Sequence, residues 1–96
     1  MAELVWAPRA AQNLERLYNF LTEKNPPAAG RAVQAIVKGV ASLSSHPEIG
    51  RPFDNATPEL REWVIPFGNS AYVLLYEYDG EQVTILAMRH GREAGY

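Results

Sequence analysis

The fold of this chain is decided by its last third, where residues 61–90 read REWVIPFGNSAYVLLYEYDGEQVTILAMRH. β-Branched and aromatic residues dominate this stretch and favour strands. Three strands are predicted, over residues 61–67, 70–78 and 81–90. Gly68-Asn69 and Asp79-Gly80 separate them and suit two-residue hairpin turns, of type II′ and type I′ respectively. The sequence therefore predicts a three-stranded antiparallel meander.

The two turns also predict which residues face each other, because a tight turn fixes the register of its hairpin. Phe67 opposite Ser70 places Trp63 opposite Leu74, and Tyr78 opposite Glu81 places Leu74 opposite Ile85. One predicted face carries Arg61, Trp63, Ile65, Tyr72, Leu74, Ile85 and Arg89. The other carries Val64, Val73, Leu75, Leu86, Met88 and His90. Both faces are largely apolar, so the face without helices must be covered by loops, by the C-terminal tail or by another protein.

The residues before the meander predict a strand and two helices. Residues 3–6 form a short apolar strand, and Pro8 stands where a helix can begin. Pro26-Pro27 end that helix and open a second, which His46-Pro47 end. Gly39 lies inside the second helix and is expected to permit a close helix approach. The apolar stripe of the first helix consists of Leu14, Leu17, Tyr18 and Leu21. Two helices joined by so few residues are expected to form an antiparallel hairpin.

These segments together define the predicted architecture. Residues 48–58, which contain Gly50, Pro52 and Pro58 and directly follow Pro47, are expected to be a loop without regular structure. The fold class is therefore α+β, in a single domain over residues 1–96. It begins with an N-terminal strand, continues with a two-helix antiparallel hairpin, and ends with a three-stranded antiparallel meander packed on the helices.

The composition narrows the classes of function. The chain has no cysteine, which excludes disulfides and thiolate metal sites. It has no metal-binding HExxH motif, no phosphate-binding loop and no Gly-x-Ser-x-Gly elbow, so no cofactor or metal is expected. No apolar run approaches the length of a membrane span, and no signal peptide is evident, which predicts a cytoplasmic protein without a membrane partner. The net charge of -2 weakly opposes nucleic acid as the main partner.

The order of these elements, and several segments within them, resemble the RelE/ParE toxin superfamily. The segments are VWAPRAAQNLERLYNFL (5–21), NPPAAGRAVQAI (25–36), LSSHPEIGRPF (43–53) and REWVIPFGNSAYVLLYEYDGEQVTILAMRHGRE (61–93). Together they span nearly the whole chain in the family's order. The NPPAAG and HPEIGRPF portions are more similar to the ParE branch than to the RelE branch.

This resemblance implies the toxin of a type II toxin–antitoxin pair. Such a toxin is neutralised by a small antitoxin, ParD-like or of another class, in a hetero-oligomer, and the antitoxin covers apolar toxin surface by helix-in-groove or strand-addition binding. ParE-like members poison DNA gyrase, which is the expected action here, without chemistry of the toxin's own. The residues expected to contact the antitoxin are Leu14, Leu17, Tyr18, Leu21, Trp63, Tyr72 and Leu74. Those expected to carry toxicity are Arg61, Arg89, His90, Arg92 and Tyr96.

Two other functions stay open on the same fold. A RelE-like toxin would cut mRNA on the ribosome, with Arg61 and Arg89 holding the phosphate and His90 or Tyr96 transferring protons. The chain departs from that pattern, because it has no lysine after Lys38 and is net acidic. The third alternative is a non-toxic family member that only binds its antitoxin.

Plain structural roles compete with these assignments. Arg89-His90 can be a solvated strand end, and Arg61 can be ion-paired with Glu59 or Glu62 at the surface. Arg51 can bind loop carbonyls or a carboxylate such as that of Asp54. His46 is expected to be a helix-end residue, and the two tryptophans are expected to lie in the core.

Overall fold

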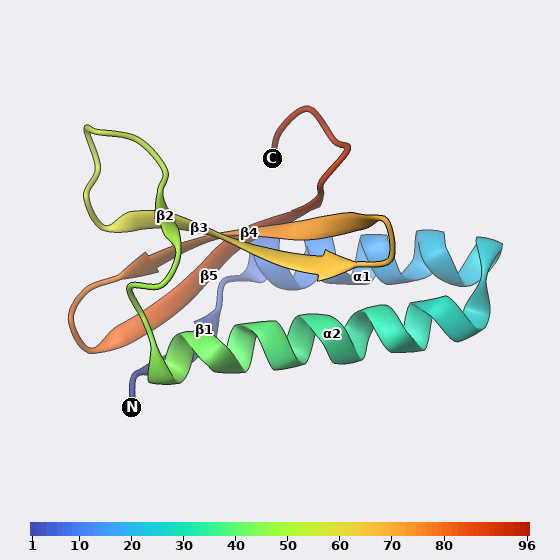
Figure 1. Cartoon of the computed structure of the whole chain (residues 1–96), viewed down its shortest axis with the longest axis horizontal. Coiled ribbons are helices and arrows are strands. Elements are labelled where there is room, and N and C mark those ends of the chain that lie inside the picture. Colours follow the sequence, from blue (N-terminus) through green and yellow to red (C-terminus); the bar gives the residue numbers. More distant parts are fainter.

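One five-stranded sheet covered on one side by two helices makes up the protein (Figure 1). A computed structural model describes all residues, 1–96. In chain order the elements are β1 (Glu3–Trp6), α1 (Pro8–Lys24), α2 (Pro26–Ser45), β2 (Arg51–Pro52), β3 (Leu60–Phe67), β4 (Ser70–Tyr78) and β5 (Gln82–His90). The strand order is β1-β5-β4-β3-β2. β1 runs parallel to β5 and every other pair is antiparallel, so the predicted α+β fold is confirmed.

The helix hairpin forms where the prolines place it. Pro8 is the first residue of α1, and Pro26-Pro27 open α2 after a single intervening residue. That residue, Asn25, serves both helices. Its backbone N–H closes α1 on the carbonyl of Leu21, and its side-chain oxygen accepts the N–H of Ala28 in the first turn of α2. The predicted ends of both helices are thereby confirmed, including His46 as the residue that ends α2.

Of the two hairpin turns predicted for the meander, the first is confirmed and the second is not. Phe67 pairs with Ser70, and only Gly68 has a positive φ, of 60°, as a type II′ turn requires. The prediction for the second turn is wrong, because a type I′ turn needs positive φ at both central residues and only Gly80 has it. The carboxylate of Asp79 instead accepts the N–H groups of Glu81 and Gln82, at 2.9 and 2.8 Å. This widens the loop, and Tyr78 pairs with Val83 rather than with Glu81.

A β-bulge in β5 changes the predicted register a second time. Tyr76 pairs with Ile85 whereas Leu75 pairs with Ala87, so Leu86 is an extra residue without a partner. One extra residue exchanges the two faces for everything that follows. Met88 and His90 therefore lie on the helix side of the sheet. Arg89 lies on the opposite side, which we call the outer face, and the prediction that Arg89 shares a face with Arg61 is wrong.

The core lies between the helices and the inner face of the sheet. Its fully buried side chains include Ile36 and Leu43 from α2 and Leu74, Tyr76 and Ile85 from the sheet. Val73 and Ala87 point to the outer face and are nevertheless buried. The C-terminal tail (residues 91–96) and the loop after β2 lie on that side of the sheet (Figure 1). The sequence predicted that loops, the C-terminal tail or another protein would cover the face without helices. In this chain the tail and one loop lie on that face.

The segment predicted as an irregular loop contains a short strand, which corrects that prediction. Arg51 pairs with Glu62 and Pro52 with Arg61, which makes β2 an edge strand beside β3. A buried hydroxyl fixes the approach to this strand, because the Tyr76 hydroxyl accepts the Gly50 N–H at 2.9 Å and donates to the Pro47 carbonyl at 2.8 Å. The glycine and prolines of this segment favour a loop, as predicted. The hydrogen bonds to the distant Tyr76 nevertheless hold part of it as a strand.

Gly39 is where α2 packs closest against β3. A Cβ atom built on Gly39 would lie 2.5 Å from Cδ1 of Ile65, and the Gly39 carbonyl accepts the indole N–H of Trp63 at 3.1 Å. We expect Gly39→Ala to destabilise the protein by about 2 kcal/mol, because the helix must move away from the sheet. In an Ile65→Ala background the same change should cost far less, which urea denaturation of the four variants would measure.

The matched control is Gly30→Ala in the same helix. Nothing lies within 4 Å of a Cβ at Gly30, so this variant should gain about 0.5–1 kcal/mol from helix propensity. Equal effects of the two glycine substitutions would contradict close packing at Gly39.

Candidate functional site

The end of β5 distributes the residues expected to carry toxicity over two faces. Arg89 pairs with Val73 and points to the outer face, whereas His90 pairs with Tyr72 and points to the helix side. Two polar sites result. One lies around Arg89 and the C-terminal tail, and the other lies between β5 and α1.

The outer site is built around the ring of Tyr96. The Arg89 guanidinium lies over this ring, 5.3 Å from its centroid, and the Tyr96 hydroxyl donates to a Glu62 carboxylate oxygen at 2.7 Å. Arg51 binds the other oxygen of Glu62 at 3.0 Å. Arg9, from the first turn of α1, donates to the Tyr96 carbonyl at 2.8 Å. The tail is therefore held by groups from α1, β3 and β5, and Arg51 of β2 supports the Glu62 carboxylate.

The environment of Tyr96 favours its protonated form. Burial is the largest cause of the raised pKa of Tyr96, and the neighbouring Glu62 carboxylate raises that pKa further. Arg89 is constrained as well, because it donates to tail carbonyls, including that of Glu93 at 3.2 Å, while its buried Nε has no partner. A phenol that resists ionisation is a poor general base, so this pair suits binding better than proton transfer.

The strength of this anchor leads to a prediction for Tyr96→Phe. The variant should lose about 1 kcal/mol of stability, because the hydrogen bond to Glu62 is lost while Arg51 still neutralises that carboxylate. The loss should shrink as the pH rises above about 10, since the unfolded chain then releases a phenolic proton that the folded chain keeps. Urea denaturation at pH 7 and above pH 10 measures both effects.

Tyr18→Phe is the control for that experiment. Tyr18 is 43% exposed and its hydroxyl makes no hydrogen bond, so the variant should be as stable as the parent chain. If both variants lose the same free energy at pH 7, the Tyr96 hydroxyl does not anchor the tail.

The second site is a groove between α1 and the ends of β3, β4 and β5, which we call the α1–β5 groove. It has a volume of about 570 Å³. Its apolar lining comes from both layers of the fold and consists of Leu17, Phe20, Leu21, Phe67 and Tyr72. Its polar rim consists of Arg16, His90, Arg92 and Glu93. Two residues expected to carry toxicity thus border a groove lined by three residues expected to contact an antitoxin.

Glu93 ties the tail to this rim. One of its carboxylate oxygens accepts the His90 N–H at 2.8 Å, and the other lies 3.3 Å from the Arg16 guanidinium. Burial alone would raise the pKa of Glu93, but the His90 N–H and the Arg16 guanidinium outweigh it, and the pKa is lowered. His90 Nδ1 accepts the Arg92 N–H at 3.2 Å, which leaves Nε2 as the donor of the neutral ring.

Arg61 lies away from both sites. Its guanidinium donates to the carbonyls of Glu48 and Gly50, at 3.1 and 2.8 Å, and lies 3.9 Å from the Glu48 carboxylate. This arrangement anchors the approach to β2. Arg61 therefore binds loop carbonyls and does not form the surface ion pair with Glu59 or Glu62 that was the structural alternative. Arg51 pairs with Glu62 rather than with Asp54.

The residues expected to contact an antitoxin are buried to different degrees. Leu74 is fully buried, and Leu17 and Tyr72 are 8% and 5% exposed, so these three chiefly hold the core together. Leu14, Leu21 and Trp63 keep partial exposure, and Tyr18 is 43% exposed. Phe20, which was not singled out from the sequence, is 59% exposed beside them. It lies one residue outside the apolar stripe of α1, which is why periodicity alone missed it.

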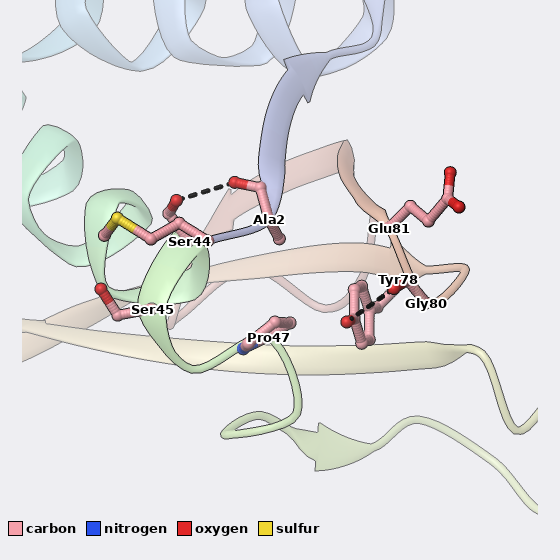
Figure 2. Close-up of a pocket in the computed structure, with 8 residues that line it drawn as sticks. Ala2, Ser44, Ser45, Pro47, Tyr78, Gly80 and Glu81 are labelled. Carbon is pink, nitrogen blue, oxygen red and sulfur yellow. Dashed lines mark hydrogen bonds between the residues drawn. The ribbon is translucent and has the colours of Figure 1, made fainter.

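Another hollow lies at the opposite end of the molecule, beside the N-terminus. Figure 2 shows it between the start of β1, the end of α2 and the β4–β5 loop, with Ser44 donating to the Ala2 carbonyl at 2.7 Å. The Tyr78 hydroxyl in the same view donates to the Gly80 carbonyl at 3.0 Å. None of the residues predicted to carry function lines this hollow, and its hydrogen bonds are internal to the fold.

Comparison with known proteins identifies the family. The ParE toxins of type II toxin–antitoxin systems (parDE) match residues 4–95. The chain belongs to this ParE toxin family. The RelE/ParE superfamily prediction is thereby confirmed.

Individual relatives of this ParE-family toxin support the same assignment. Toxin RelE3 of Caulobacter vibrioides is 32% identical over 93 residues, which cover 97% of this chain and 98% of that toxin. Toxin RelE1 of the same organism is 38% identical over 85 residues, 88% of each chain. A chain from the structure of the chromosomal ParDE TA system of P. aeruginosa superposes with a TM-score of 0.74 at 26% identity, covering 94% of this toxin and 96% of that chain. Neither helix of the toxin is long and apolar enough to cross a membrane.

Proposed function

We propose that this ParE-family toxin arrests bacterial growth by binding and poisoning DNA gyrase, and that a cognate antitoxin neutralises it in a hetero-oligomer. The match to ParE toxins over residues 4–95 carries this proposal. The similarity to a chain of the P. aeruginosa ParDE system supports an antitoxin partner. We assign target contact to the end of β5 and the tail, through Arg89, His90, Arg92 and Tyr96.

The distribution of polar groups supports binding rather than chemistry. RNA cleavage needs a base, an acid and cations around one phosphate. Of the four groups proposed for that reaction, Arg61 is held by loop carbonyls on the inner face, and Arg89 and Tyr96 stack on the outer face. His90 borders the α1–β5 groove instead. The four groups do not surround one point.

The test is growth after induction of this chain alone, followed by assays with purified gyrase and supercoiled plasmid. A gyrase poison should stop growth and should leave linear plasmid after the protein is denatured and digested, because trapped double-strand breaks are then exposed. Arg31 is an exposed arginine on α2, far along the sequence from the tail. Arg31→Ala therefore serves as the charge-removal control for substitutions of Arg89 at the end of β5. Intact plasmid in the presence of an active toxin would contradict the gyrase proposal.

Ribosome-dependent mRNA cleavage is the second candidate, because the Caulobacter vibrioides relatives are named RelE toxins. It predicts cut transcripts in induced cells with undamaged plasmid, which primer extension on an abundant mRNA would reveal. A third outcome, normal growth on induction, would indicate a family member that binds an antitoxin without being toxic.

A further inference from the structure

The outer side of the helix layer carries an apolar strip that no other part of the chain covers. α1 and α2 lie side by side on one face of the sheet, while the tail and the loop after β2 lie on the other (Figure 1). Tyr18 is 43% exposed and Val37 is 57% exposed, and Val33 is partly exposed. Val33 lines one hollow with Tyr18 and another with Val37. The three side chains therefore form a continuous strip, which we call the helix seam.

A carboxylate and an ammonium group flank the helix seam on opposite sides. Glu15 lies one turn before Tyr18 on α1, on the side turned away from α2, because Leu14 and Tyr18 are the residues that line the hollow between the helices. Lys38 follows Val37 on α2, and this one residue turns it about 100° further from α1. Both charged side chains are exposed, and neither takes part in an ion pair. Across the helix layer the order is therefore negative charge, apolar strip, positive charge.

This order of charges makes the helix layer complementary to a second copy of itself. In a symmetric dimer the same surface patch of both copies is in contact. A two-fold axis parallel to the helices sets α1 of each copy against α2 of the other, with the two seams in contact. Glu15 of each copy then faces Lys38 of the other, so the dimer contains this ion pair twice. A two-fold axis across the helices would instead bring charges of like sign together.

We propose that the helix seam binds a second copy of this chain, in a symmetric dimer oriented by two Glu15–Lys38 ion pairs. The apolar strip supplies most of the affinity, because exposed ion pairs contribute little, while the charges fix the orientation. The strip is small, so the dimer is weak, with a dissociation constant on the order of 100 µM. The dimer does not require that the toxin bind gyrase, because the tail stays uncovered on the opposite side of the sheet.

Sedimentation equilibrium of the purified toxin, from about 10 µM to about 1 mM, brackets this dissociation constant. Glu15→Lys and Lys38→Glu should each weaken the dimer about tenfold, because both ion pairs become contacts between like charges. An equimolar mixture of the two variants should restore the parent affinity, since each variant then meets the opposite charge in both pairs. Glu59→Lys, the control, reverses an exposed carboxylate just before β3. It should dimerise as the parent chain does and should not rescue Lys38→Glu.

Val37→Ser tests the apolar part of the interface. Val37 is 57% exposed in the single chain, so the variant should stay folded. The dimer loses this contact in both copies and should weaken at least about tenfold. The proposal is overturned if the parent chain is monomeric throughout the concentration range, or if mixing Glu15→Lys with Lys38→Glu gives no tighter association than either variant alone. It is also overturned if the nuclear magnetic resonance signals of Tyr18 and Val37 shift only when the antitoxin is added, which would assign the helix seam to the antitoxin.

Discussion

Replacing Arg89 and His90 together by alanine is expected to abolish growth arrest. Both residues lie at the end of β5, and the bulge at Leu86 points them to opposite faces of the sheet. The double variant therefore alters the outer site and the α1–β5 groove at once. If each side chain contributes as an interface hot spot, the pair supplies about 4 kcal/mol, roughly a thousandfold in affinity for the target. Colony counts on inducing medium and plasmid linearisation by gyrase measure the effect.

The two single variants separate the faces. Arg89→Ala removes the guanidinium that lies over Tyr96, and Arg89 does not itself line the groove, so toxicity should fall more than antitoxin binding does. His90→Ala removes a donor from the groove rim, so it should weaken both toxicity and antitoxin binding. Thermal unfolding must show that each variant is folded. Full growth arrest by a folded double variant would remove the end of β5 from the target-binding surface.

Local signals in the sequence predicted most of the elements, because their causes are local. Pro26-Pro27 forbid continuation of α1 and suit the first turn of α2, so the boundary follows from the chemistry of proline alone. Gly68 supplies the positive φ of a tight turn, and the register of β3 against β4 follows from it. Gly39 was expected to allow a close approach, and Ile65 occupies the space that its missing side chain leaves.

The candidate site depended on features without a local signal. No residue type marks Leu86 as a bulge, yet this one extra residue moves Arg89 to the outer face and His90 to the groove. The tail is placed by contacts between distant parts of the chain, from Tyr96 to Glu62 and to Arg9. Only Glu93 could have indicated from the sequence where the tail lies. It follows His90 by three residues, and a carboxylate at that spacing can accept the His90 N–H. The types of the polar residues could be predicted from the sequence, whereas their grouping could not.

The second large effect is expected for Gly50→Ala, at the approach to β2. A Cβ on Gly50 would lie 2.6 Å from both the Glu62 carbonyl oxygen and the Tyr76 hydroxyl. Backbone and a fully buried ring cannot yield as a flexible side chain can, and the shift would also strain the hydrogen bonds that Gly50 makes to Tyr76 and Arg61. We expect a loss of about 4 kcal/mol, from overpacking together with weakened hydrogen bonds. That loss is a large part of a typical domain's stability.

Urea denaturation of Gly50→Ala measures this loss, with Gly95→Ala as the control, because nothing lies within 4 Å of a Cβ at Gly95. Tyr76→Phe distinguishes the two neighbours of the added methyl group. It removes the hydroxyl but keeps the ring and the Glu62 carbonyl, so Gly50→Ala should stay strongly destabilising in that background. A small effect of Gly50→Ala in the parent chain would mean that β2 can leave β3 at little cost.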